Sequence, residues 1–504
     1  MCVRRRVACL LSLSSLFFCS VATAAVVDVT SNADSGVGSL REAITQANAN
    51  PDPSSITFAE GLGSIVLQSP LVITESITID GGEDGQTISG GSATRLFEVP
   101  EDFILVSMSD LVLEAGFIEA DAAASNEPVC SPIDGRGGAM CSDGFVSLER
   151  VTVRDSVATG VAASGGGLFL NRGGELVSSW VVGNMVSGDR NFSGVGAQGG
   201  GVATGAFNEA NFDSAARLLV SGSLIENNSA LGERGLGGGL YTPSGAILNM
   251  SSSAVINNDA SFITGAMRVS LASISNSTIS GNFAPRNGGL TIDISINLAN
   301  PNLFLAPEIR FTTISDNQDT DAGASDGGAL RTLFFNRDFT LAMDSVILAD
   351  NTAASGNFES LLINNSGQGT VTHDVQNSIF GDDVAEINGV NSGNVFTDTP
   401  LLGSLSDQGC SSPAGAPGAR VCAPVMPIIN GSPAIDLGGD PGFSIFDQRG
   451  LGFDRVVGAE ADAGAFEFGN GQPAAVVPVP SLNEFGLFLL TLIMAGAGLL
   501  LLRR

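Results

Sequence analysis

One phrase recurs through the middle of this 504-residue chain: a serine or threonine, a short alternating apolar run, and a closing asparagine. Successive copies end 24 to 44 residues apart. The closing residues are Asn184, Asn228, Asn258, Asn282, Asn317 and Asn351. Repeats of this length indicate a solenoid or an array, and their unequal spacing indicates loops of variable length between fixed strands.

The apolar runs between the asparagines are three to five residues long and rich in β-branched side chains, which predicts short strands. No segment between them has the helical periodicity that a βαβ crossover needs. A parallel β-helix and a β-propeller both remain possible. Propeller blades usually carry aromatic signatures, and this chain has one tryptophan, Trp180, and one tyrosine, Tyr241. We therefore expect a parallel β-helix, right-handed by the rule for parallel crossovers.

The repeat also predicts what its residues do. Asparagine tolerates left-handed backbone angles, and its amide can stack from coil to coil, so we expect the asparagines to form a ladder at a turn. The glycine clusters at 199–201 and 237–239 would form sharp corners. We expect many of the 28 phenylalanines to fill the interior.

The stretch GSLREAITQANA, residues 38 to 49, predicts a short helix that covers the first coil. Ser39 is a good N-cap, and Glu42 stands three residues later, as in a capping box. Ile44 and Ala47 would face the solenoid. Near the other end, Arg449 and Arg455 stand among aspartates, and we expect them to form a buried structural network.

Both termini predict export. Three arginines, an apolar stretch and a small-x-small site form a secretory signal peptide, with the cleavage residues Ala22, Ala24 and Ala25. Residues 485 to 502 are uncharged and mostly apolar, and Arg503 and Arg504 close the chain. That length just spans a bilayer, with the arginines held in the cytoplasm. A permanent anchor and a temporary membrane hold both fit this tail.

The formal net charge is −30, which makes nucleic acid an unsuitable partner and favours solubility. Four of the seven cysteines lie beyond the signal peptide, in two close pairs. Outside the cytosol these would form disulfides, and of the three possible connectivities we expect the local one. The pairs are Cys130 with Cys141 and Cys410 with Cys422.

The sequence gives little sign of catalysis, so we expect no catalytic residues. His373 is the only histidine, and no nucleophile motif accompanies it. Arg268 and Arg331 could serve lyase chemistry, but spacing ties no carboxylate cluster to them. A glycosidase needs only two carboxylates and stays possible. Sugar-binding surfaces usually present tryptophan or tyrosine, which are scarce here.

We expect no metal site and no cofactor. One histidine and paired cysteines cannot build a usual zinc site. The stretch NQDTDAGASDGG, residues 317 to 328, has alanine at 322 and glycine at 328, where an EF-hand requires glycine and glutamate. A solvated acidic turn is the first interpretation, and adventitious calcium is the second.

Three stretches resemble bacterial β-helix surface proteins. Residues 34 to 48, DSGVGSLREAITQAN, resemble the CSLREA motif that opens many of them, with Gly38 in place of its cysteine. Residues 430 to 467 resemble the close of choice-of-anchor β-helix proteins. The tail resembles the Ile-Pro-Thr-Leu type of sorting signal, in which valine, serine and phenylalanine replace isoleucine, threonine and tryptophan. Its matching residues are Val479, Pro480, Ser481, Leu482, Glu484, Phe485, Gly486, Arg503 and Arg504.

The resemblance implies that an exosortase-like sorting transpeptidase removes the tail and passes the protein from the inner membrane to the cell surface. We expect an all-β fold: a right-handed parallel β-helix with a short N-terminal capping helix and a C-terminal transmembrane helix. The expected function is a binding, adhesion or structural module with an unknown surface ligand, and the alternative is a polysaccharide lyase or glycoside hydrolase. The expected parts are a signal peptide (1–24), an N-terminal cap (25–60), the β-helix (61–400), a C-terminal cap (401–468), a Gly/Pro linker (469–480) and the sorting tail (481–504).

Overall fold

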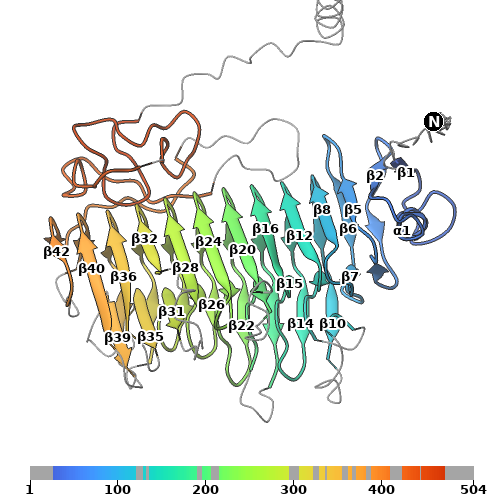
Figure 1. Cartoon of the computed structure of the whole chain (residues 1–504), viewed down its shortest axis with the longest axis horizontal. Coiled ribbons are helices and arrows are strands. Elements are labelled where there is room, and N and C mark those ends of the chain that lie inside the picture. Colours follow the sequence, from blue (N-terminus) through green and yellow to red (C-terminus); the bar gives the residue numbers. More distant parts are fainter. Residues whose placement is uncertain are drawn as a thin grey trace, which may run out of the picture.

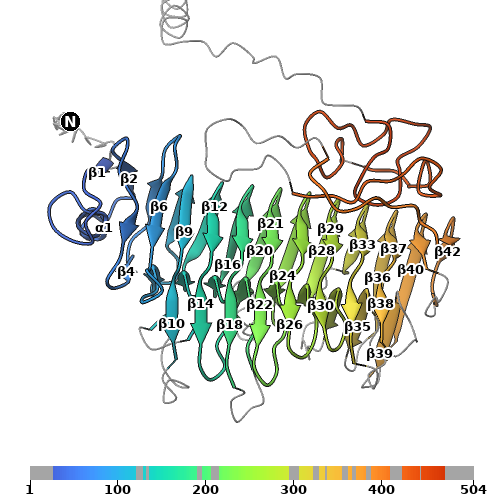
Figure 2. The same cartoon turned by 180° about the vertical axis from the view of Figure 1, so that it is seen from behind.

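The computed structural model describes residues 26 to 470, apart from 121–128, 132–134, 190–195, 206–214, 295–305, 322–327, 335–337, 355–360, 366–369, 382–386, 409–422 and 443. Within these ranges the chain forms one stack of coils, shown from two sides in Figure 1 and Figure 2. The signal peptide and the tail of the sequence prediction lie outside the described residues.

Four parallel sheets run along the stack in the described part of the chain, and each strand pairs with strands of the coils before and after it. The 13-stranded sheet comprises β1 (Val26–Val29), β2 (Ser54–Phe58), β5 (Ile77–Asp80), β8 (Leu105–Ser109), β12 (Phe145–Glu149), β16 (Gly173–Val177), β20 (Arg217–Ser221), β24 (Ile247–Ser251), β28 (Leu271–Ser275), β32 (Glu308–Arg310), β36 (Phe339–Asp344), β40 (Val371–Gln376) and β42 (Asn391–Ser392). The 12-stranded sheet comprises β3 (Ile65–Val66), β6 (Gln86–Ser89), β9 (Leu111–Glu114), β13 (Thr152–Arg154), β17 (Trp180–Val182), β21 (Leu224–Glu226), β25 (Ala254–Ile256), β29 (Thr278–Ser280), β33 (Thr313–Ser315), β37 (Ile347–Ala349), β41 (Ile379–Phe380) and β43 (Val395–Phe396).

The other two sheets are smaller. The 8-stranded sheet comprises β10 (Phe117–Glu119), β14 (Val157–Thr159), β18 (Met185–Ser187), β22 (Ser229–Leu231), β26 (Asp259–Ala260), β30 (Phe283–Ala284), β34 (Gln318–Asp319) and β38 (Thr352–Ala353). The 10-stranded sheet comprises β4 (Leu71–Val72), β7 (Phe97–Val99), β11 (Met140–Ser142), β15 (Leu168–Leu170), β19 (Val202–Thr204), β23 (Leu240–Tyr241), β27 (Met267–Val269), β31 (Leu290–Ile294), β35 (Leu330–Phe334) and β39 (Leu361–Asn365).

A complete coil passes through the four sheets in a fixed order, for example β12, β13, β14 and β15. Neighbouring coils therefore stack strand on strand, about 4.8 Å apart. The expected right-handed parallel β-helix is confirmed (Figure 1).

The interior is filled by aliphatic side chains rather than by phenylalanine. In the 13-stranded sheet, Met108, Leu148, Leu176 and Val220 follow one another at the same register position and are fully or almost fully buried. The main buried cluster of the described residues consists largely of isoleucine, leucine and valine, with few phenylalanines. The expectation of a phenylalanine core was wrong because short strands that meet at close corners leave room for compact β-branched side chains.

The asparagine ladder is present. Asn258 donates its side-chain amide to the Oδ1 of Asn282 in the next coil, at 3.0 Å, and accepts the amide of Asn228 from the previous coil at the same distance. Equivalent bonds join all six asparagines of the repeat, which are buried. Each ladder amide also donates to a main-chain carbonyl, as Asn258 does to Ile225. The ladder thus supplies hydrogen bonds at a turn where the sheets do not.

The left-handed backbone angle lies one residue before each ladder asparagine, not on it. These preceding residues all have φ between 54° and 68°, and they are Gly183, Asn227, Asn257, Gly281, Asp316 and Asp350. Glycine, asparagine and aspartate are the residues that adopt this angle at least cost. The repeat therefore separates two tasks, since one residue makes the turn and the next makes the ladder.

A second ladder of serines follows the preceding corner of the coil. The amide nitrogen of Ser179 donates to Ser223 Oγ at 3.1 Å, and that of Ser223 donates to Ser253 Oγ at 3.0 Å. The residue before each of these serines again has positive φ, as at Ser178 and Ser252. The serines near the start of the repeats that end at Asn228, Asn258 and Asn282 are therefore ladder residues too.

The predicted N-terminal helix is α1 (Leu40–Asn48), which packs on β1 and β2 and buries Leu40, Ala43, Ile44 and Ala47. Ser39 accepts the amide of Glu42 at 3.2 Å, while the Glu42 carboxylate reaches back to the amide of Gly38 at 2.6 Å. Gly38 has φ of +76°, an angle that suits glycine better than the cysteine of the CSLREA motif.

The described residues between 401 and 470 lie along the side of the stack, over the middle and late coils (Figure 1). Thr278 of β29 donates to Gln448 at 2.6 Å, and Thr313 of β33 accepts the amide of Ala465 at 3.1 Å. This region therefore covers part of the outer face of the 12-stranded sheet, at the corner where that sheet meets the 13-stranded one. Among the described residues, no helix is both long enough and apolar enough to cross a membrane. The apolar tail, predicted as a transmembrane helix, is not among those residues.

Candidate functional site

The outer face of the 10-stranded sheet changes character along the stack. One column of outward side chains runs through Cys141, Phe169 and Ala203, which are at most 5% exposed and form an apolar cluster. The column continues through residues that carry polar groups. We call these residues, together with Asp293 two positions beyond Thr291, the polar row: Tyr241, Arg268, Thr291, Asp293 and Arg331. Glu98 precedes Cys141 in the same column, so the first half of the face also carries a charged group. The row is a candidate site because it brings a phenol, two guanidiniums and a carboxylate together on one sheet face.

An ion pair forms the centre of the polar row. Arg268 of β27 donates from Nη2 to Asp293 Oδ2 at 2.5 Å and from Nε to the same oxygen at 3.1 Å. The two side chains are 19% and 15% exposed. Arg268 stands beside Thr291 in the register of β27 and β31, and Asp293 lies two residues further along β31. The ion pair thus links an outward position of β27 to an outward position of β31.

Buried hydrogen bonds hold the floor of the polar row. The hydroxyl of Thr291 lies 2.6 Å from that of Thr264 and accepts the amide of Asn287 at 3.0 Å. Asn287 also donates to the carbonyl of Leu290 and accepts the amide of Gly289. Thr291 is therefore fixed from two sides, which keeps the neighbouring strand positions rigid.

Tyr241 lies at the boundary between the apolar cluster and the polar row, next to Arg268 in register. Burial raises the pKa of its phenol, Arg268 opposes that shift, and Asp293 adds to it. The phenol is therefore protonated at neutral pH and can donate a hydrogen bond. A phenol, a guanidinium and a carboxylate together offer a proton donor, a positive charge and a proton acceptor.

No group of three or more candidate metal ligands occurs in the part of the chain that the structure describes. The acidic turn considered for calcium is dispersed: Asn317 belongs to the asparagine ladder, and Asp319 accepts the amide of Asp321. Asp326 is outside the described residues. The chemistry that the polar row can perform is therefore derived from its own side chains.

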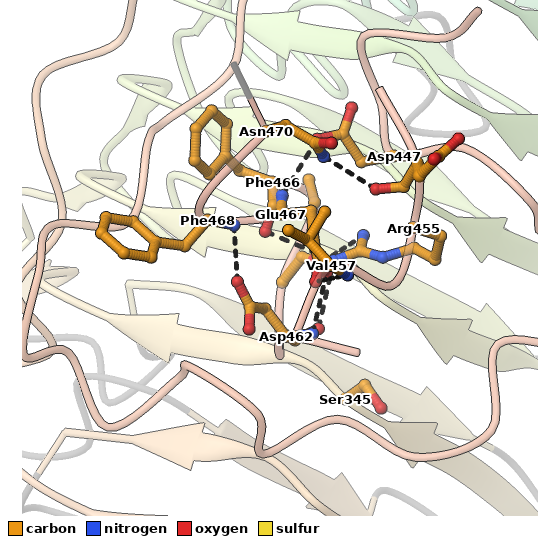
Figure 3. Close-up of polar contacts among 12 residues, drawn as sticks. Ser345, Asp447, Arg455, Val457, Asp462, Phe466, Glu467, Phe468 and Asn470 are labelled. Atoms are coloured by element: carbon orange, nitrogen blue, oxygen red, sulfur yellow. Dashed lines mark hydrogen bonds and ion pairs between the residues drawn. The ribbon is translucent and has the colours of Figure 1, made fainter. Parts of the chain in front are cut away.

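The region at 401 to 470 holds a second polar cluster, shown in Figure 3. Arg455 is 1% exposed and donates to Glu467 Oε2 at 3.0 Å. Glu467 also accepts the amides of Val457 and Asp462. Arg455 reaches across to the coils, where it donates to the Oδ1 of Asn276 at 3.2 Å. The cluster thus ties the C-terminal region to the solenoid.

Arg449 completes this second cluster. It forms a two-pronged contact with Asp447, and its guanidinium lies 4.0 Å and 3.9 Å from the ring centres of Phe453 and Phe466. The predicted buried network of Arg449 and Arg455 is therefore present. Its acidic partners are Asp447, Asp462 and Glu467, and we interpret it as structural because its charged groups are buried and bonded to one another.

The cluster holds three carboxylates against two guanidiniums. Burial raises the pKa of Glu467 to about 7, from an ordinary value of 4.5, and it also raises that of Asp462. Between pH 4.5 and 7, Glu467 is therefore mostly protonated in the folded protein and mostly ionised in the unfolded chain. Because the folded state holds more protons in this range, the contribution of Glu467 to the free energy of unfolding falls as the pH rises from 4.5 through 7.

The structure accounts for part of the site residues predicted from sequence. Cys130 and Cys141 form a disulfide, with their Cα atoms 5.2 Å apart. Cys410 and Cys422, the signal cleavage residues and the sorting motif are outside the described residues. His373 is buried inside β40, where its Nε2 lies 3.4 Å from Thr332 Oγ1. That position agrees with a structural role.

Sequence reasoning named Arg268 and Arg331 but missed Asp293 and Tyr241 as their neighbours. The two partners of the ion pair are 25 residues apart, and only the register of β27 on β31 brings them together. The signal was available in principle for Tyr241 and Arg268, because each stands three residues after a glycine, at 238 and 265. The variable loop lengths hide that offset.

The solved structures that match this chain include two whose titles name lyases. The structure titled pectate lyase Pel9A matches 89% of this chain and 97% of its own, at 13% identity and a TM-score of 0.41. The structure of alginate lyase AlyF-OU02 in complex with G6 matches 76% of this chain and 90% of its own, at 12% identity and a TM-score of 0.22. No family model matches the chain, and no curated protein matches it.

The expectation that the chain is not an enzyme requires correction. Both similar structures are lyases by their titles, which contradicts that expectation. That expectation rested on the scarcity of histidine, tryptophan and tyrosine, and the polar row brings charged groups together without histidine. At 12% and 13% identity and TM-scores below 0.5, the likeness carries no reaction over to this chain.

Proposed function

We propose that this protein binds and cleaves a polysaccharide on the outer face of the 10-stranded sheet, at the polar row. The substrate class is a chain that contains uronic acids, and the reaction is a β-elimination. The observation that carries the proposal is the ion pair of Arg268 and Asp293, which stays 19% and 15% open while the column leading to it is buried.

Each group has a role in this reaction. The guanidinium of Arg268 binds the carboxylate of the sugar and offsets the negative charge that develops there. The carboxylate of Asp293 takes the proton from the carbon next to that carboxylate. Tyr241 donates its phenolic proton to the leaving glycosidic oxygen. The C–O bond breaks, a C=C bond forms in the sugar ring, and the proton on Asp293 returns to the phenolate through solvent.

The charge of the whole chain makes the local charge of the row important. A formal net charge of −30 repels an acidic polymer at long range, so positive groups at the site must supply the attraction. Arg268 and Arg331 both belong to the row and both carry a positive charge. Salt screens this long-range repulsion between the protein and the polymer. We therefore expect binding of an acidic polysaccharide to strengthen at moderate ionic strength.

A degradation screen tests this proposal. The secreted protein is incubated with acidic and neutral polysaccharides, and the ultraviolet absorbance of unsaturated product is followed. We expect product from at least one uronic-acid polymer, and a loss of at least 100-fold in rate for Arg268→Ala, Asp293→Asn and Tyr241→Phe. Arg154→Ala is the matched control, because Arg154 pairs with Glu114 on the 12-stranded sheet, away from the row. Product formed equally by all the variants, or by none of the proteins from any polymer, contradicts the proposal.

The same proposal includes export. A signal peptide ending near Ala24, a membrane-held tail and an exosortase-like transpeptidase would deliver the β-helix to the cell surface. The support is the order of motif, apolar span and Arg503–Arg504 in the sequence. Intact-mass measurement of protein released from the cell surface decides the fate of the tail. A mass that still includes residues 481 to 504 refutes removal and leaves a permanent anchor.

A further inference from the structure

An exposed aromatic side chain lies at the edge of the 10-stranded sheet, several coils before the polar row. Phe103 is 85% exposed, whereas Phe283 and Phe396 are 41% and 45% exposed. It belongs to the turn between β7 and β8, and its backbone has φ of +65°. A bulky side chain is rarely found at this angle, and here it gains little burial in return. Folding alone gives no reason for phenylalanine at this position.

Neighbouring coils hold the ring in place. The guanidinium of Arg172, in the turn between β15 and β16, lies 4.6 Å from the centre of the Phe103 ring. Arg172 also pairs with Asp102, with Nη2 2.6 Å from Oδ2. Between the two, Asp143 accepts the side-chain amide of Asn171, the residue before Arg172. Three successive coils thus fix one exposed ring with charged groups at its rim.

The arrangement suits a sugar ring. An aromatic face attracts the C–H groups of a flat, partly apolar ligand, and nearby charged groups bond to its hydroxyls. Asp102 and Arg172 are 47% and 28% exposed, so both are open to such a ligand. Within the described residues, the Nε of Arg172 is buried and has no hydrogen-bond partner. Its guanidinium contacts the ring and Asp102, and it interacts electrostatically with Asp143.

The position relates this ring to the polar row. Strands β7 and β23 are four steps apart in the 10-stranded sheet, which corresponds to about 19 Å along the stack. We infer that Phe103, Asp102 and Arg172 form a remote sugar-binding subsite for the same polysaccharide chain that the polar row acts on. The inference rests on the proposed function. It predicts that long oligosaccharides reach this subsite while short ones at the row do not.

Chain length provides the test. Binding of uronic-acid oligosaccharides of increasing length is measured by calorimetry for the wild type, Phe103→Ala, Phe103→Trp and the control Phe283→Ala, which truncates an exposed phenylalanine on the 8-stranded sheet. We expect Phe103→Ala to weaken binding of the long oligosaccharides about tenfold, with the short ones unchanged. Phe103→Trp should bind at least as well as the wild type, and Phe283→Ala should have no effect. Equal binding by Phe103→Ala and the wild type at every length overturns the inference.

A second variant separates binding from folding. Phe103→Gly suits the positive φ, so we expect it to melt at or above the wild-type temperature while binding long oligosaccharides as weakly as Phe103→Ala. A clear fall in melting temperature would show that the ring is a structural element and would refute the subsite. Cleavage that depends on Arg268 with no effect of Phe103 removes the subsite and keeps the proposed function. Binding that depends on Phe103 without cleavage does the reverse, and no binding at any length removes both.

Discussion

Removal of one ladder asparagine should destabilise the protein far more than removal of an exposed one. The side chain of Asn258 donates three hydrogen bonds, to Asn282, Ile225 and Ile256, and accepts two, both from Asn228. The three donated contacts share the two hydrogens of the amide, so they count as two bonds. Four bonds at about 1 kcal/mol each give a loss of about 4 kcal/mol for Asn258→Ala, because the partners left behind are buried.

The matched control is Asn249→Ala in the adjoining 13-stranded sheet. Asn249 is exposed and belongs to the same coil as Asn258, so its truncation should change stability by at most about 0.5 kcal/mol. The free energy of unfolding is measured by chemical denaturation, with circular dichroism as the signal. Equal losses for the two variants would refute the claim that the ladder stabilises the stack.

Three more predictions concern the interior and the C-terminal cluster. Glu467→Gln should flatten the fall in melting temperature between pH 4.5 and 7, because burial raises the pKa of Glu467 to about 7. The control Glu460→Gln, at an exposed position, should leave the pH profile unchanged, and identical profiles for wild type and Glu467→Gln would exclude this assignment. Replacing Cys130 and Cys141 by alanine should cost about 3 kcal/mol by the loop-entropy model, since the disulfide closes a separation of 11 residues, and unchanged denaturation would argue against it. Ile279→Ala should cost about 2–4 kcal/mol, because Ile279 is fully buried inside the coil, and a loss below 1 kcal/mol in denaturant titrations would show that the register is wrong.

The fold was predictable because each copy of the sequence repeat corresponds to one coil of the structure. Each copy carries an inward aliphatic residue such as Ile279 and a ladder asparagine such as Asn282, so the period of the coil appears directly in the sequence. The capping helix was also predictable, because Ser39 and Glu42 act within four residues of each other. Local signals of this kind can be recognised in the sequence without knowledge of the tertiary structure.

The candidate sites were only partly predictable, because they depend on register between coils. The pairs Arg268 with Asp293 and Phe103 with Arg172 are 25 and 69 residues apart, and loops of variable length separate them. The phenylalanines were also misjudged. Their number suggested a packed interior, yet Phe103 lies on the surface and the interior is mostly aliphatic. Composition reports how many aromatic residues exist but not which face of a strand or turn they occupy.

The proposed action on polysaccharides is tested most directly by a crystal structure of the protein with a long uronic-acid oligosaccharide, using the Asp293→Asn variant to prevent turnover. The account predicts a sugar carboxylate bound to Arg268, a glycosidic oxygen near the Tyr241 hydroxyl, and density for a further sugar of the same chain against Phe103. Density confined to another face, such as the 13-stranded sheet, or no bound sugar at a concentration that saturates binding in solution, would contradict it.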